Sequence, residues 1–442
     1  MTSFDEADFG YALLDDYVRA FVQHSKFSVP YAEATFHLLF GQLPGIRDMK
    51  IYRSDSSWLD PRIHPCYFSA SGSGKGEGSN FLARMAERLG MRYQPVTKVT
   101  DSGLIGTIND EKKIEYGWLH QTHGINILAA TEGSVILQDR PPKEAMNVMD
   151  LLQITMNTMG SKDSVIAKKI GFGEAIEFQP TTSLFFTTYV PTNLTDIVLQ
   201  RGLLQRMYVV SNTTTLDMRR KVIDELHKDL MNPKARATGS AEESIVERLK
   251  NISKYYAGRD TIPFSKGAVE KLSSYTTAMF DMIRNAEPFL QEKLGEFISR
   301  LDAQQTRLSF QFAAMNKHDT VEPFDAQIVY DLHTSVQFYQ LISFLERVID
   351  VPVPWRNKFY LTKERVLTTI KRMENIDGKW FLDEATGQKW VERESLSTEI
   401  ASLHTVTTMT AKIYIDQMKD WKLIEVKHHR GLQKEFVRPL GS

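Results

Sequence analysis

A glycine-rich stretch that contains a single lysine is the part of this sequence best suited to chemistry. Residues 69–79 read S-A-S-G-S-G-K-G-E-G-S, after a short apolar run, Cys66–Phe68, and before apolar residues at helical spacing. Glycines let a backbone turn tightly, so that successive N–H groups point at one anion. Lys75 adds a positive charge where the outer phosphates of a nucleotide would lie. The pattern predicts a phosphate-binding loop between a strand and a helix, with a flexible glycine-serine linker as the alternative.

The stretch departs from the motif G-x-x-x-x-G-K-[ST] at two positions. Ser69 replaces the first glycine, and Gly76 replaces the hydroxyl residue that usually binds Mg²⁺. Glu77 or Ser79 could supply the missing metal ligand. The residues expected to cradle a nucleotide are Ser71, Gly72, Ser73, Gly74, Lys75, Gly76, Glu77 and Gly78.

A second apolar run, Ile125–Glu132, reads as a buried strand that ends in an acid. In phosphate-loop enzymes the strand beside the loop carries acids that bind the metal and polarise the attacking water. Glu132 is therefore the candidate for activating water and a further candidate metal ligand. Thr131 stands where a metal-binding aspartate is usual, with Asp139 as a substitute. The alternative is a plain core strand capped by an exposed glutamate.

Two later segments could also face a nucleotide. The run Ser183–Tyr189 is apolar and turns polar at its end, which would face the γ-phosphate if this strand lies next to the loop strand. Arg206 precedes another apolar run, Met207–Val210. Such an arginine is usually a surface residue, but in ring ATPases its guanidinium can reach the γ-phosphate bound to the neighbouring subunit.

The elements that would hold these residues follow from periodicity. Short apolar runs alternate with helical patterns from residue 65 to about 210, which predicts an α/β domain with a mainly parallel sheet. The predicted divisions are a helical lead-in, an ATPase core, a helical lid with its extension, and a C-terminal domain, at residues 1–50, 51–212, 213–350 and 351–442. Helical patterns cover residues 241–257, 264–286, 289–316 and 324–349.

The C-terminal domain follows a proline-rich linker, Val351–Trp355. Two short apolar strands around a basic turn, placed after helices, are the pattern of a winged helix. Residues 395–419 would form its helix-turn-helix, with Lys412 on the polar face of the recognition helix. Lys427 and Arg430 in the wing suit a phosphate backbone. A winged helix is also a frequent protein–protein module.

Composition sets broad limits on function. The chain has 442 residues, a net charge of −1 and one cysteine, Cys66, which excludes a disulfide framework and a cysteine zinc cluster. Because the net charge is close to zero, contact with nucleic acid must rely on local basic patches. No signal-peptide pattern or apolar membrane span is evident, so we expect a cytoplasmic or nucleoid location. His120 and His123 have no evident third metal ligand, so we expect surface or satisfied histidines.

Taken in order, segments from residue 65 to about 315 resemble the AAA+ core of minichromosome maintenance (MCM) replicative helicases. Gly117-Trp118-Leu119 resembles the family's approach to its acidic strand. Val165–Gly171 resembles its S-I-A-K-A-G hairpin, which carries a DNA-contacting lysine into a central channel. Lys168 takes that position, with Lys169 beside it, and a solvated turn is the alternative. Thr188 stands where the family's sensor strand usually ends in asparagine.

The resemblance also covers arginines. Gly202–Arg206 resembles the family's A-L-L-S-R segment, which points to Arg206 as the arginine finger. Arg300 and Arg307 have the spacing of its two lid arginines, with Arg300 as the second sensor. The resemblance implies ATP, Mg²⁺, a hexameric ring and single-stranded DNA in the channel. Too few residues precede the core to hold the family's large N-terminal domain, so we expect a compact form, such as a virus or plasmid protein.

The combined expectation is an ATP-driven DNA helicase or translocase of the MCM-like AAA+ type. Lys75 would bind ATP, Glu132 would orient water, and Arg206 and Arg300 would stabilise charge on the γ-phosphate. One alternative is a weakly hydrolysing or inactive AAA+ protein that binds DNA as an initiator or assembly scaffold, which the substitutions at Gly76 and Thr131 favour. Another is a viral genome-handling ATPase.

Overall fold

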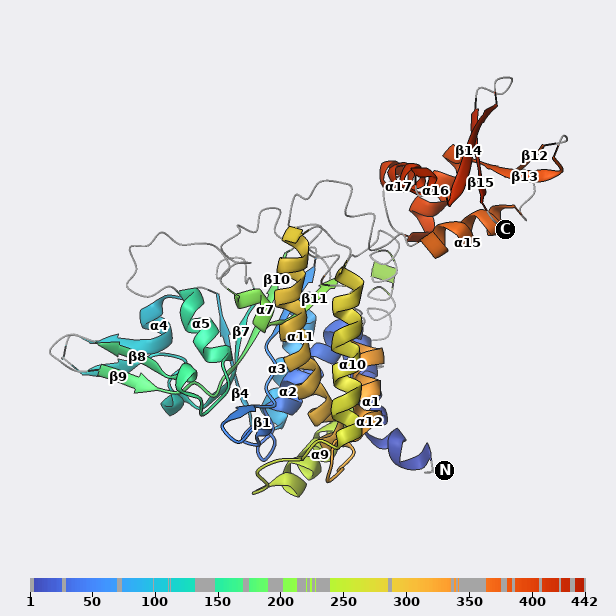
Figure 1. Cartoon of the computed structure of the whole chain (residues 1–442). Helices are drawn as coiled ribbons and strands as arrows, with labels where there is room; N and C mark the ends of the chain where they lie inside the picture. The colour runs from blue at the N-terminus through green and yellow to red at the C-terminus, as the bar shows by residue number, and fades with distance from the viewer. Residues whose placement is uncertain are drawn as a thin grey trace. The chain divides into compact units, whose positions relative to one another are not determined.

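The chain folds into two compact units in the computed structural model, Met1–Phe280 with Leu294–Ile349, and Asp281–Lys293 with Asp350–Ser442 (Figure 1). The second unit takes in the predicted C-terminal domain. The first joins the predicted helical lead-in, core and lid. The structure describes residues 4–25, 29–69, 74–97, 99–109, 111, 113–131, 148–169, 175–189, 202–212, 220, 223–224, 227, 239–284, 288–334, 338, 341, 363–374, 380–383, 386–404, 408–420, 423–429 and 434–440.

A five-stranded sheet in which every pairing is parallel forms the centre of the first unit. Its strands, in spatial order, are β11 (Tyr208–Asn212), β3 (Pro65–Ser69), β10 (Ser183–Thr188), β7 (Ile125–Ala130) and β4 (Arg92–Val96). This arrangement confirms the expected α/β fold. It also corrects one expectation, because β10 lies between β3 and the predicted acidic strand β7, which is therefore not beside the loop strand.

The order of the strands singles out the carboxyl end of β3. The chain leaves β3 for β4 at one edge of the sheet, whereas it leaves β10 for β11 on the other side of β3. The connections thus diverge at β3, and open α/β sheets bind ligands at such a switch point, outside the carboxyl ends of the strands. The glycine-rich stretch begins there, and α3 (Lys75–Arg88) follows it.

Two N-terminal helices, α1 (Phe4–Ser25) and α2 (Val29–Gly41), belong to the same core. The Tyr31 ring of α2 stacks on Tyr67 of β3 with 4.0 Å between centroids. Phe21 of α1 packs edge-on against both Tyr31 and Phe81 of α3. The predicted lead-in therefore packs on the core, where its aromatic rings fix the position of α3.

A set of helices completes the first unit. Glu242 binds Arg84 and Arg88 of α3 at 3.0 and 3.4 Å, while Gln304 donates to the Met207 carbonyl at 2.8 Å. These contacts join the helices to the sheet domain. Among the residues described, no helix is long and apolar enough to cross a membrane. The helices are α9 (Gly239–Tyr256), α10 (Lys266–Ile283), α11 (Pro288–Met315), α12 (Pro323–Val329) and a π-helix (Tyr330–Thr334). They match the predicted helical patterns at 241–257, 264–286 and 289–316 and the first part of the pattern at 324–349, most of whose remainder lies outside the described residues.

Short elements interrupt the connections between the sheet strands. One insertion precedes β7 and pairs β5 with β6, and another precedes β10 and pairs β8 with β9. Figure 1 shows α4, α5, β8 and β9 together at one side of the sheet. The short elements are β1 (Ile51–Ser54), β2 (Ser57–Leu59), α4 (Asp101–Ile105), β5 (Gly106–Ile108), β6 (Ile114–Tyr116), η1 (Gln121–His123), α5 (Val148–Met156), η3 (Lys162–Ser164), β8 (Ile166–Lys169), β9 (Ala175–Phe178) and α7 (Leu203–Arg206).

The second unit contains an antiparallel sheet in the order β12-β13-β15-β14. Val366, Leu396, Ile415 and Val437 form part of its apolar core. Two successive helices followed by a hairpin match the predicted pattern, whereas the β12–β13 hairpin was not predicted. The elements are α15 (Lys363–Met373), β12 (Trp380–Asp383), β13 (Gln388–Glu392), α16 (Arg393–His404), α17 (Thr408–Asp420), β14 (Ile424–His429) and β15 (Lys434–Pro439).

Candidate active site

Lys75 lies at the carboxyl edge of the sheet, at the first turn of α3. Gly74 precedes it with a φ of 68°, a left-handed conformation that glycine adopts without strain. The Lys75 ammonium donates to the Ser69 carbonyl at 2.8 Å and lies 3.7 Å from the centroid of the Tyr189 ring. The lysine therefore spans the ends of β3 and β10. Residues 70–73 of the stretch, including Ser71, Gly72 and Ser73, lie outside the described residues.

Two buried hydroxyl groups near Lys75 make no hydrogen bond. Ser69 ends β3 with no exposed surface and Thr188 ends β10 at 1 % exposure, and neither side-chain oxygen has a partner. Buried hydroxyls are nearly always hydrogen-bonded. By contrast, the neighbouring Thr187 hydroxyl donates to the Thr131 carbonyl at 3.0 Å. Both oxygens could therefore hydrogen-bond to a polar ligand at this edge of the sheet.

The glycines after Lys75 face different ways. A Cβ at Gly78 would lie 2.3 Å from the Tyr31 ring, and the Gly78 N–H already donates within the helix to the Gly74 carbonyl at 2.9 Å. The Ser79 hydroxyl is buried and bonds the Lys75 carbonyl at 2.9 Å and the Tyr31 hydroxyl at 3.3 Å. We therefore assign Gly78 and Ser79 to packing of α3 on the core, and not to nucleotide or metal binding.

The solvent side of this turn offers little to a metal ion. Gly76 and Glu77 are exposed, and a Cβ at Gly76 would meet nothing within 4 Å. Glu132 lies outside the described residues. Within the described part of the chain, no group of three or more histidine, cysteine, aspartate or glutamate residues could hold a metal ion. The described residues at this edge do not by themselves assemble a Mg²⁺ site, so no step below is assigned to the metal.

A separate cavity of about 460 Å³, here called the arginine pocket, collects positive charge. Arg206 donates to the Gly202 carbonyl at 2.8 Å, whereas its buried Nε has no partner. Burial lowers the pKa of Arg206, and the nearby positive charge of Arg300 lowers it further. The lining includes Arg53, Arg206, Arg300, Arg307, Thr158 and Glu296.

The described residues do not bring the two halves of the predicted site together within one chain. None of the described residues of the stretch 69–79 lines the arginine pocket. Lys75 faces the carboxyl edge of the sheet, whereas Arg206 and Arg300 come from α7 and α11. Tertiary structure brings those two arginines together although 94 residues of sequence separate them. The sequence spacing contained no signal for Arg53, which reaches the same pocket from β1.

The hairpin lysines have unequal surroundings. Lys168 lies on β8, and its ammonium binds the Asp101 carboxylate at 2.9 Å with both side chains largely covered. Burial opposes ionisation of Asp101, but the hydrogen bond and charge of Lys168 together with hydrogen bonds from Ser102 outweigh it and lower the Asp101 pKa. Lys169 is exposed. Lys168 is therefore held in a structural ion pair, while Lys169 is accessible to a nucleic acid, and the hairpin tip at 170–174 lies outside the described residues.

Two of the three cations predicted to bind DNA in the C-terminal unit form ion pairs. Lys412 of α17 binds Glu394 at 2.7 Å, and Lys427 of β14 binds Asp383 at 2.9 Å. Arg430 lies outside the described residues. Exposed ion pairs contribute little free energy, so a phosphate group can compete for both lysines.

The histidines match the expectation of satisfied side chains. The His120 ring stacks on Tyr116 and its Nδ1 bonds the Thr122 hydroxyl at 2.9 Å, while His123 Nε2 bonds the Tyr116 carbonyl at 2.9 Å. Cys66 is buried in the core, and this burial raises the pKa of its thiol.

The search for relatives adds no further constraint. No protein-family model matches the chain, and no curated protein matches it significantly. The function must therefore be argued from the sheet edge, the arginine pocket and the hairpins.

Proposed function

We propose that this chain is an ATPase of the AAA+ type that translocates along DNA as a replicative helicase. One observation carries the proposal. The glycine-rich stretch and Lys75 follow β3 at the switch point of a parallel sheet, beside two buried hydroxyls that have no hydrogen-bond partner. Ligands of such sheets bind there, and a loop of glycines before a helix suits a phosphate chain.

The partners of Lys75 suggest how the phosphates bind. Two of its partners, the Ser69 carbonyl and the Tyr189 ring, are neutral, so a phosphate anion attracts the ammonium more strongly than either of these two. Lys75 then turns from the Ser69 carbonyl to the outer phosphates. The Thr188 hydroxyl lies at the end of the adjacent strand and donates toward the γ-phosphate. Orientation of the attacking water is assigned to Glu132, as the sequence resemblance implies.

Arg206 and Arg300 act on the nucleotide of a neighbouring copy. They line a cavity to which no described residue of the loop contributes, which supports a γ-phosphate presented by another subunit as their target. An arginine supplied across an interface is worth about 10³–10⁵ in turnover in comparable enzymes. Contacts of this kind are head-to-tail and close into a ring when the rotation allows it. A hexamer is the state that the resemblance implies.

The β8–β9 hairpin is the proposed contact with single-stranded DNA. Lys169 is accessible in the structure, and Lys168 would have to leave Asp101 to take part. The C-terminal unit, proposed to be a winged helix, would bind the backbone of duplex DNA through Lys412, Lys427 and Arg430.

Hydrolysis of ATP with and without single-stranded DNA, measured beside particle mass, tests the proposal. We expect turnover that DNA stimulates, in particles several times the 50.6 kDa chain mass. Lys75→Ala protein is the blank for contaminating ATPases. A 50.6 kDa particle without turnover above that blank contradicts the proposal.

A second function has its own support, namely a weakly hydrolysing AAA+ protein that binds DNA and assembles on it. Gly76 lacks the usual metal-binding hydroxyl, and the nearby Ser79 hydroxyl is committed to the core. Gly76→Thr separates the two functions because the site has room for a side chain. A large rise in turnover with this variant would favour the weakly hydrolysing protein, whereas unchanged or reduced turnover favours the motor.

A further inference from the structure

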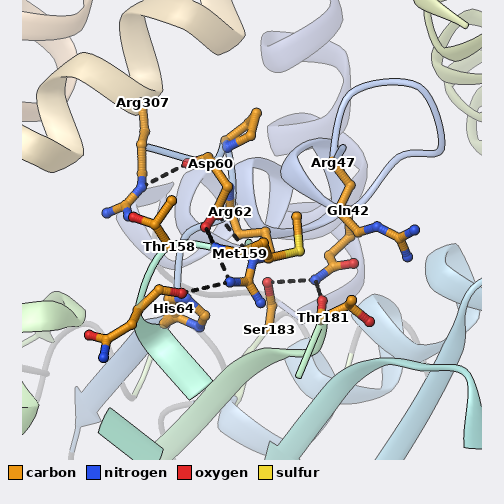
Figure 2. A network of polar contacts seen from close by, with 12 residues as sticks. Gln42, Arg47, Asp60, Arg62, His64, Thr158, Met159, Thr181, Ser183 and Arg307 are labelled. Atoms are coloured by element: carbon orange, nitrogen blue, oxygen red, sulfur yellow. Dashed lines mark hydrogen bonds and ion pairs between the residues drawn. The ribbon is translucent and has the colours of Figure 1, made fainter. Parts of the chain in front are cut away.

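A buried ion pair lies just before β3, between Asp60 and Arg62 (Figure 2). Arg62 has no exposed surface and Asp60 is 2 % exposed. The guanidinium Nε and Nη2 donate to the two carboxylate oxygens at 3.0 and 3.2 Å. This bidentate geometry fixes both side chains.

The pair also binds the backbone on both sides of the β8–β9 hairpin. Arg62 donates to the Asn157 carbonyl at 3.0 Å and to the Thr182 carbonyl at 3.1 Å. Asp60 accepts the Met159 N–H at 2.9 Å. Asn157 and Met159 precede β8, whereas Thr182 follows β9. One ion pair therefore fixes the start and the end of the hairpin segment.

The same pair is joined to the arginine pocket. Arg307 of α11 donates from Nε to the Asp60 carbonyl at 2.9 Å, and it lines the pocket together with Arg300, two helical turns earlier (Figure 2). Asn157 and Thr158 line the pocket as well. The wall of the pocket and the base of the hairpin are thus built from the same residues.

Stability alone does not account for such a pair. Burial opposes ionisation of Asp60, but the charges of Arg62 and Arg307 outweigh it and lower the Asp60 pKa to about 2. The pair is therefore ionised, and a buried pair of this kind often stabilises no more than apolar residues of similar volume do. What apolar residues cannot reproduce is the directional link from one guanidinium to the backbone on both sides of the hairpin.

We infer that Asp60 and Arg62 are positioning residues that transmit the occupancy of the arginine pocket to the β8–β9 hairpin. The functional part of this inference rests on the proposed function. When a neighbouring nucleotide draws Arg300 and Arg307, α11 pulls on the Asp60 carbonyl. The rigid pair then shifts both ends of the hairpin together. Hydrolysis in one subunit would thereby move the DNA contact in the next.

Amide hydrogen exchange tests the mechanical link without reference to ATP. Arg307→Met removes the hydrogen bond from α11 to the Asp60 carbonyl. Amide exchange rates are measured in residues 157–169 and 175–183, with α3 as the control segment. We expect about tenfold faster exchange at the hairpin with no change in α3. The same substitution in an Asp60→Leu/Arg62→Met background should have no further effect on the hairpin. Equal effects of Arg307→Met in both backgrounds would overturn the inference.

The double variant is chosen because either single substitution leaves a buried charge unpaired. If it fails to fold, Arg62→Lys replaces it, because a lysine keeps the charge but lacks the planar fork that bonds the Asn157 and Thr182 carbonyls together with Asp60. Hairpin exchange that is as slow in Arg62→Lys as in the parent chain would equally overturn the link.

Turnover supplies a second readout that a purely structural role would not change. In the double variant we expect basal ATP hydrolysis to persist while stimulation by single-stranded DNA falls to near onefold. Full stimulation would contradict the inference and leave the proposed function intact. If the parent chain hydrolyses no ATP, the proposed function fails, and the exchange experiment alone decides whether the pair links the pocket to the hairpin.

Discussion

The sheet edge at Lys75 and the arginine pocket are opposite in character. The sheet edge has one described cation, held by a carbonyl and an aromatic ring, with two unsatisfied hydroxyls beside it. The pocket has four arginines around a cavity of about 460 Å³, and one of them, Arg206, keeps a buried nitrogen without a partner. Under the proposed function the first would hold a phosphate chain, whereas the second would add charge to an anion that a neighbouring copy presents.

This contrast indicates how one chemical site can be divided between copies of a chain. Phosphoryl transfer needs a cradle and additional positive charge at the same phosphate. Under the proposed function the sheet edge would supply the cradle and the arginine pocket the added charge, and no described residue belongs to both. If the two halves do not combine in an assembly, the difference between them has no role in phosphoryl transfer.

Lys75→Ala should have the largest effect and reduce ATP turnover to background. The substitution removes the one described cation at the sheet edge. Turnover and nucleotide binding are measured on the same preparation. Lys266→Ala is the matched control, because Lys266 is exposed and pairs only loosely with Glu270 on α10. Turnover that survives Lys75→Ala would remove the sheet edge from the site.

Arg206→Ala should reduce turnover in the assembly by about a thousandfold while nucleotide binding persists. Arg47→Ala serves as the control, because Arg47 pairs with the adjacent Asp48 at the surface. Mixing Arg206→Ala with Lys75→Ala chains should restore part of the turnover, since some interfaces then contain one intact copy of each half. An absence of restoration at every mixing ratio would mean that the two halves act within one chain or not at all.

Substitution of Gly76 and Gly78 by alanine should change the free energy of unfolding in opposite directions. Gly78→Ala places a Cβ within 2.3 Å of the Tyr31 ring and should reduce the free energy of unfolding by about 1–3 kcal/mol. Gly76→Ala meets no atom within 4 Å and should raise it by up to about 1 kcal/mol, because alanine loses less entropy in a helix. Denaturant unfolding of both variants gives the comparison. Equal effects would contradict the assignment of one glycine to the core and the other to solvent.

The smallest predicted effect concerns the hairpin lysines. Lys169→Ala should lower the salt dependence of single-strand binding by about one phosphate contact, or a slope of about 0.7. Lys168→Ala should change this slope less, because Asp101 already binds its ammonium. Binding is measured by titration over a range of salt concentrations. A larger change with Lys168 would mean that DNA breaks the ion pair with Asp101.

Local patterns in the sequence were sufficient to predict most of the strands and helices. The apolar run at Cys66–Phe68 became β3, the run at Ser183–Tyr189 became β10, and the helical spacing after Lys75 became α3. Such patterns depend on neighbours within a few residues, so the sequence shows them directly. The β5–β6 and β12–β13 hairpins were missed because their strands are short, and the β5–β6 strands are largely exposed.

The site was predicted less completely. Lys75 and Thr188 lie at neighbouring strand ends, as expected, but Gly78 and Ser79 face the core because Tyr31 of a distant helix packs on them. Lys168 has a partner, Asp101, that no spacing rule connects with it. Neither of these contacts could be inferred from the glycine-rich stretch or from the hairpin alone.

The sequence by itself determined which segments become strands and helices, and that a lysine follows a glycine-rich turn at the end of one strand. Tertiary structure alone decided the strand order that makes this turn a switch point, the gathering of four arginines in one pocket, and the buried link from Asp60 and Arg62 to the hairpin. The physical reason is the distance along the sequence over which each kind of interaction acts. Periodicity records which face of an element is buried, whereas the identity of the partner on that face depends on residues that are distant in the sequence.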